Sequence, residues 1–202
     1  LGDVYKRQRP GEPLAVDSAE SLINNMFFDV RRYDLAKVGR YKFNKKLSFT
    51  NRIVGFALAE DAVSPETGEV VAEAGTMVSE ELAREIQNAA IPFVMMQTEE
   101  GHVVKVLSNM MVDIKEYVDI ENPKELGVTE SVYYPVLREI LDENEDDEDA
   151  IKEAIAANIS ELIPKHITKE DIFASINYNM HLEYGMGNDD DICLLYTSPS
   201  PR

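Results

Sequence analysis

Apolar residues recur at helical spacing near both ends of the chain. Asp17 and Glu20 stand three residues apart, as in a capping box, ahead of an apolar stripe made of Leu22, Ile23, Met26 and Phe27. Near the other end, Thr168 and Asp171 repeat the capping spacing, and Gly185 is expected to end that helix. The pattern therefore predicts one helix that begins at Asp17 and another that begins after Thr168.

A basic stretch follows the first of these helices. In it the aromatic residues Tyr41 and Phe43 alternate with Arg40, Lys42 and Asn44. Because successive side chains of a strand point to opposite faces, this alternation predicts a short strand or an extended loop. The aromatic side chains are expected to point inward and the cations outward.

The middle of the chain changes to short apolar runs separated by turn residues. Four stretches are predicted to be strands, at residues 53–58, 70–72, 91–96 and 103–107. A turn at residues 64–68 is expected to join the first two as a hairpin. Ser79 is expected to cap a helix whose buried edge is formed by Leu82, Ile86 and Ala90. This order, strand–strand–helix–strand–strand, predicts a compact β-rich module.

Helical spacing returns after this module. Residues 129–141 are predicted to be a helix, in which Pro135 must lie in the first turn or introduce a kink. Residues 142–149 hold seven acidic side chains in eight positions, which is typical of a solvated loop, and residues 151–163 predict a second helix. The expected fold class is α+β, with helical segments from both ends of the chain interrupted by the β-rich module and an acidic helical pair.

Charge is distributed unevenly along the sequence. The 202 residues carry 20 basic and 38 acidic side chains, a net charge of −18, yet residues 1–52 carry 11 basic and 6 acidic and residues 53–202 carry 9 and 32. Because phosphates attract clustered Lys and Arg, the net charge argues against a free-standing nucleic-acid-binding protein. The basic strip from Arg31 to Arg52 remains a candidate phosphate-contacting surface, with an ordinary solvated face as the alternative.

The sequence shows no self-contained active site. The three histidines lie far apart, without a neighbour at metal-ligand spacing, and no nucleophile or phosphate-loop motif is present. Three adjacent carboxylates at 189–191 cannot all reach one ion from a regular element, so they are interpreted as a solvated loop or a partner-facing turn. We therefore expect no catalytic residue and no metal ligand, and the sequence argues against an autonomous hydrolase. The absence of a long apolar run and the single cysteine predict a soluble cytosolic protein without a membrane partner.

Residues near both ends resemble the lobe region of the β subunit of bacterial DNA-directed RNA polymerase. The resemblance rests on RPGEPL at 9–14, SLINNMFF at 21–28 and RYDLAKVGRYKFN at 32–44. It resumes with ITKEDI at 167–172 and runs through NDDDI at 188–192.

The resemblance implies an interrupted domain. It divides the chain into two lobe parts at 9–52 and 165–192, and a lineage-specific insertion at 53–164, with a β-rich module at 53–111 and a mostly helical part at 112–164. The β-rich module is similar to small modules that recur in the two large polymerase subunits. The helices beginning at Asp17 and Thr168 are expected to pack together across the insertion. Residues 1–8 and 193–202 resemble translated sequencing-adapter tails and are expected to be non-native.

The resemblance also implies a function, that of a non-catalytic piece of a nucleotidyltransferase. In the family the lobe borders downstream DNA and the non-template strand, and the Mg²⁺ ions are held by the β′ subunit, so no cofactor is expected in this segment. The implied partners are DNA and the β′, α and sigma subunits, in the bacterial cytoplasm at the nucleoid. The candidate DNA contacts are Arg40 first, with Lys42, Lys45 and Arg32 as supporting phosphate contacts. Alternatively, the acidic insertion is a protein-interaction module for a transcription factor or polymerase partner.

Overall fold

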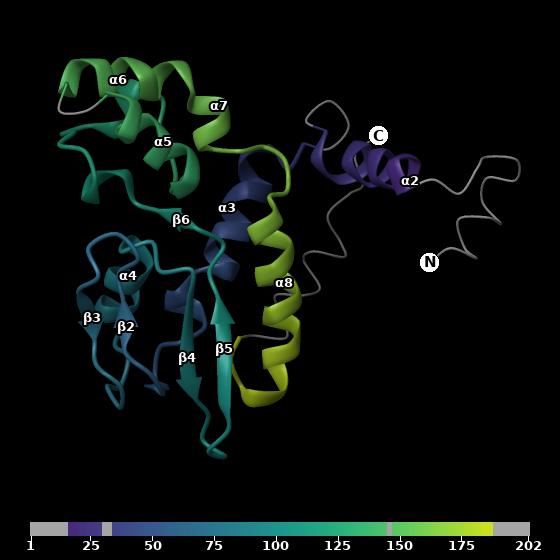
Figure 1. Ribbon diagram of the computed structural model, residues 1–202, viewed down its shortest axis with the longest axis vertical. Coiled ribbons are helices and arrows are strands. Elements are labelled where there is room, and N and C mark those ends of the chain that lie inside the picture. The colour runs from purple at the N-terminus through teal and green to yellow at the C-terminus, as the bar shows by residue number, and fades with distance from the viewer. Residues whose placement is uncertain (1–15, 30–33, 145–146, 188–202) are drawn as a thin grey trace, which may run out of the picture.

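The computed structural model describes residues 16–29, 34–144 and 147–187 (Figure 1). The adapter-like tails, Arg32 and the acidic residues 189–191 lie outside the described residues. In the described part of the chain, helices and small antiparallel sheets are mixed, which confirms the α+β fold class. None of the helices in these ranges has the length and apolar character that a membrane span requires.

Helices from the two ends of the chain lie on one side of the molecule (Figure 1). Helix α2 (Val16–Ile23) is followed by a π-helical turn (Asn24–Phe28), and α3 spans Ala36–Leu47. Helix α8 (Lys169–His181) begins with the expected capping box of Thr168 and Asp171, and a 3₁₀ turn (Leu182–Tyr184) ends at Gly185, whose φ is +74°. Helix α8 packs against α3. The resemblance had implied that α8 packs against α2, and the described residues show no such packing.

The prediction of a strand or loop at residues 40–44 is wrong, because this stretch lies inside α3. Aromatic and cationic residues alternate in the sequence, but the buried positions are not two residues apart. Arg40 and Leu47 are buried and Phe43 is partly buried, and these positions are three and four residues apart on one helical face. That face packs on Ala174 and Tyr178 of α8, so a tertiary contact decides the conformation.

The β-rich module has strands on both sides of one helix, as predicted, but three strands and not two precede the helix, and the pairing differs. A 3₁₀ turn (Phe49–Asn51) leads into β1 (Ala57–Leu58), β2 (Ala62–Val63), β3 (Val70–Ala72), α4 (Glu80–Asn88), β4 (Phe93–Gln97) and β5 (Val103–Leu107). The turn at 64–68 joins β2 to β3, whereas β1 pairs with β4 in the antiparallel sheet β1–β4–β5. The first predicted strand fails because Gly55, with φ +87°, turns the chain there and donates its N–H to the carbonyl of Val78.

The mostly helical part of the chain that follows the β-rich module begins with a two-stranded ladder. Strand β6 (Met111–Val112) pairs with β7 (Val132–Tyr133), and 3₁₀ turns cover Ile114–Glu116 and Pro123–Leu126. Pro135 lies in the first turn of α5 (Tyr134–Asn144), as predicted. The second predicted helix is divided into α6 (Glu148–Ala157) and α7 (Ile159–Leu162) at Asn158, whose side-chain amide donates back to the carbonyl of Ala154.

Three apolar clusters hold these parts together. One is centred on the β-rich module, includes Phe49, Ile86 and Met96, and extends to Met186 after α8. A second joins β6, β7 and helices α5 to α7 around Leu137 and Ile155. The third is small and lies between α3 and α8. Because the third cluster holds few apolar residues, polar contacts carry much of the junction between the two ends of the chain.

Candidate nucleic-acid interface

Arg40, the first candidate for a DNA contact, points into the protein. Its side chain is 1% exposed, and its Nη1 lies 2.8 Å from Oδ2 of Asp171, itself fully buried. Its Nε donates to the carbonyl of Pro164 at 2.8 Å, and its Nη2 donates to the carbonyl of His166. The guanidinium is therefore enclosed by protein groups in this structure, and its contact with DNA stays an untested prediction.

The Arg40 ion pair joins the chain on the two sides of residues 53–164. Asp171 also accepts the backbone N–H of Thr168 at 3.1 Å, so the capping box that starts α8 and the ion pair share one carboxylate. Nearby, the N–H of Leu35 donates to the carbonyl of Lys165 at 2.7 Å. Residues before position 53 are thus joined to residues after position 164 by an ion pair and a backbone hydrogen bond.

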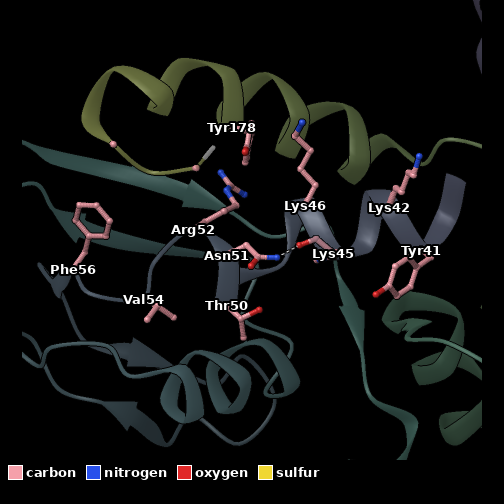
Figure 2. A pocket seen from close by; sticks show the side chains of 12 residues that line it. Tyr41, Lys42, Lys45, Lys46, Thr50, Asn51, Arg52, Val54, Phe56 and Tyr178 are labelled. Carbon is pink, nitrogen blue, oxygen red and sulfur yellow. Dashed lines mark hydrogen bonds between the residues drawn. The ribbon is translucent and has the colours of Figure 1, made fainter. Parts of the chain in front are cut away.

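Lys42 and Lys45 are exposed on α3, and Arg32 lies outside the described residues. Both lysines line a hollow of about 480 Å³ between α3, the 3₁₀ turn at residues 49–51 and the end of α8 (Figure 2). The residues that line it are Tyr41, Lys42, Lys45, Lys46, Thr50, Asn51, Arg52, Val54, Phe56, Tyr178, Gly185 and Gly187. We call this hollow the basic pocket. The structure thus brings two of the predicted site residues together at one concave surface.

Among the residues that the structure describes, the basic pocket is lined by four cations and by no carboxylate. Lys46 Nζ lies 5.1 Å from the centre of the Tyr178 ring, and Arg52 Cζ lies 5.9 Å from it. In Figure 2 the Arg52 side chain extends from the 3₁₀ turn toward Tyr178 on α8. Cations held on an aromatic ring keep their charge while their position is fixed. The two cations beside Tyr178 are therefore held in fixed positions.

Arg52 was grouped with the basic strip but was not predicted as a site residue. It is 1% exposed, and burial lowers its pKa from 12.5 to about 10, opposed in part by Tyr178. It therefore stays charged at neutral pH. Its Nη1 donates to the carbonyl of Leu107 at 2.5 Å and its Nη2 to Oδ1 of Asn177 at 2.6 Å. No sequence signal distinguishes Arg52 from its neighbours, because its partners lie 55 and 125 residues away.

His181 provides a pH-dependent contact beside this pocket. It is buried, its Nε2 lies 3.4 Å from Asn177 Nδ2, and burial followed by the nearby Arg52 charge lowers its pKa below 6.5, with Glu183 opposing. The unfolded chain then binds a proton that the folded chain does not. Stability that is complete above pH 6.5 is therefore lost as the pH falls through that value.

We expect urea midpoints measured between pH 7.5 and 5.5 to fall less steeply for His181→Gln than for the unmodified chain. The glutamine amide can still bond Asn177 but cannot be protonated in this range. His102→Gln, at a side chain 63% exposed, is the matched control and should keep the original slope. Equal slopes for the two variants would remove His181 as the cause.

The two other histidines lie in different parts of the structure. His166 lies beside Arg40, where burial and the Arg40 charge lower its pKa, and His102 is on the loop between β4 and β5. Among the described residues, no three His, Cys, Asp or Glu side chains gather as a metal site.

Comparison with known proteins gives a consistent result, although no family model matches the chain. The chain is 52% identical over 192 residues to the DNA-directed RNA polymerase subunit beta of Clostridium acetobutylicum and to that of Clostridioides difficile. It is 53% identical over 192 residues to the same subunit of Alkaliphilus metalliredigens. Each alignment covers 95% of this chain and 15% of the relative, so the chain spans about 15% of the length of these relatives. The resemblance stated from the sequence is confirmed.

Proposed function

We propose that this chain borders the DNA cleft and contacts nucleic-acid phosphates through the basic pocket. The premise is that the chain belongs to the β-subunit family of bacterial DNA-directed RNA polymerase, as a segment of that subunit. The observation that carries the proposal is the exposure of Lys42 and Lys45 on the wall of the basic pocket, whose described lining residues include no carboxylate. Phosphate contacts of this kind position a nucleic acid without reading its sequence.

The charge of the rest of the chain supports an orientation for this surface. Residues 53–164 hold 26 acidic and 6 basic side chains, so most of the insertion repels a polyanion. Helix α3 has Lys37, Lys42 and Lys45 among its exposed side chains and no acidic residue between Ala36 and Leu47. A nucleic acid approaching this chain would therefore be directed to α3 and kept away from the insertion.

We assign no step of nucleotidyl transfer to this segment. In the proposed setting the Mg²⁺ ions and their carboxylate ligands lie in the β′ subunit, and the segment contributes to the position of the DNA. Its proposed partners are DNA and the β′, α and sigma subunits, at the nucleoid in the bacterial cytoplasm. The division into lobe parts at 9–52 and 165–192 and an insertion at 53–164 belongs to the same proposal, and the bonds of Arg40 to Pro164, His166 and Asp171 support it.

The test is the salt dependence of promoter open complexes formed by polymerase whose β subunit carries this segment. Lys42→Ala combined with Lys45→Ala should weaken the complexes and reduce the slope of log K against log salt. Each lost phosphate contact is worth a slope of about 0.7–0.9, so the pair should lower it by about 1.5.

Lys124→Ala is the matched control, because it removes an exposed lysine from the 3₁₀ turn at residues 123–126, in the insertion. Its slope should equal that of the unmodified enzyme. A double variant whose slope is also unchanged would remove the basic pocket from the DNA contacts.

A further inference from the structure

Gly187 lies against the aromatic ring that holds two cations of the basic pocket. A Cβ placed on Gly187 would lie 2.8 Å from Cε2 and Cζ of Tyr178, and the φ of this glycine is +120°. Lys46 and Arg52 stand beside the same ring, at 5.1 Å and 5.9 Å from its centre. The last described range of the chain, residues 147–187, therefore ends on the wall of the pocket and next to its cations.

Three consecutive carboxylates follow Gly187 at a distance of two residues. Asp189, Asp190 and Asp191, which we call the acidic run, lie outside the described residues. Because an extended chain spans at most about 3.6 Å per residue, Asp189 lies within about 7 Å of Gly187, and Asp191 within about 14 Å. The covalent chain alone thus keeps the acidic run within reach of the basic pocket.

The charges of the acidic run and of the pocket are complementary. The described lining includes Lys42, Lys45, Lys46 and Arg52, and none of its described members is acidic. Figure 2 shows Lys42 and Lys46 extending from α3 toward α8, the helix that precedes Gly187. A tether of a few residues gives the run an effective concentration on the order of millimolar, which favours it over a separate acidic peptide.

We infer that the acidic run occupies the basic pocket when nucleic acid is absent, with its carboxylates paired to the ammonium groups of Lys42 and Lys46. The run then competes with phosphates for the same cations and is an autoinhibitory contact within the chain. Exposed ion pairs are weak, so a polyanion that enters the pocket can displace it. The inference uses the pocket on which the proposed function rests, but the contact needs no nucleic acid, so the two proposals can fail separately.

Carbodiimide crosslinking tests this contact in polymerase whose β subunit carries this segment, first without DNA. The reagent joins a carboxylate to a lysine nitrogen that touches it, through an amide bond, and mass spectrometry identifies the pair. The acidic run should be joined to Lys42 or Lys46. Crosslinks from the run to Lys37 and Lys169, which are exposed but do not line the pocket, should be at least several-fold fewer.

An ion pair elsewhere in the chain is the internal standard for this reaction. Lys152 Nζ lies 3.6 Å from Glu148 Oε2 on α6, so this pair should be crosslinked in every sample. If it is crosslinked while the acidic run is joined to neither Lys42 nor Lys46, or is joined equally to Lys37, the inference is wrong. Crosslinks from the run to a second copy or to another subunit, in place of the pocket lysines, would overturn it as well.

Adding promoter DNA separates this inference from the proposed function. In open complexes the crosslinks from the acidic run to Lys42 and Lys46 should fall several-fold, because phosphates take the same cations. Crosslinks that form without DNA and persist in open complexes would support the contact of the acidic run and count against the phosphate contact in the pocket.

Discussion

Replacing Arg40 by alanine is expected to destabilise the chain by about 3–5 kcal/mol, the usual cost of removing one partner from a buried ion pair. The loss of stability comes mainly from Asp171, the partner that the substitution leaves behind. Asp171 is fully buried, and without Arg40 its carboxylate keeps the Thr168 N–H and a long contact to Asn109 Nδ2 at 3.4 Å, but no cation. The carbonyls of Pro164 and His166 also lose their donor. The contact between the two sides of residues 53–164 should loosen as a result.

Urea unfolding of the full chain checks this prediction. Arg84→Ala is the control, because Arg84 pairs with Glu80 at 2.8 Å on the surface, with both side chains about two-thirds exposed. Its loss should cost about 1 kcal/mol or less. If the two arginine variants lose similar stability, the buried pair does not hold the two sides of residues 53–164 together.

The second large effect is expected at Asn177, which joins α8 to the β-rich module. Its Oδ1 accepts from Arg52 Nη2 at 2.6 Å and from the Leu107 N–H at 2.9 Å, and its Nδ2 donates to the Lys105 carbonyl at 2.8 Å. Asn177→Ala removes all three bonds and leaves the buried Arg52 cation with one acceptor fewer. Since bonds to charged groups contribute about 1.5–3 kcal/mol, we expect a loss of about 2–4 kcal/mol.

Asn177→Asp separates the lost acceptor from the lost donor. Aspartate keeps an acceptor for Arg52 and Leu107 and adds a carboxylate beside the cation, but it cannot donate to Lys105. We expect it to recover more than half of the stability that alanine loses, measured as the free energy of unfolding in urea. Recovery no better than that of Asn177→Ser, which is too short to reach both partners, would show that the Arg52 bond is not the main contribution.

Local signals in the sequence predicted the elements that depend on near neighbours. The capping box at Thr168, the Ser79 cap of α4 and the position of Pro135 in α5 are set by groups within a few residues, and all three are confirmed. The turn at 64–68 was placed correctly for the same reason, because Gly68 takes a φ of +71° there.

Contacts between distant residues account for what the sequence did not predict. Arg40 looked like a surface cation among lysines, and only the approach of Asp171, 131 residues away, shows that it is buried. The pairing of β1 with β4, and the packing of α3 on α8, depend on the same kind of long-range contact. Among the candidate DNA contacts, Lys42 and Lys45 lie at the surface, as predicted for phosphate-binding residues, while their contact with DNA stays a prediction.

Crosslinking from position 45 to promoter DNA shows whether DNA lies against α3 in the open complex. A photoreactive residue replaces Lys45 in polymerase whose β subunit carries this segment, and open complexes are irradiated. The account predicts crosslinks to DNA from position 45 and none from the same probe at position 124, in the acidic insertion. DNA crosslinks from position 124 with none from position 45 would contradict it, because the nucleic acid would then lie against the insertion and not against the basic pocket.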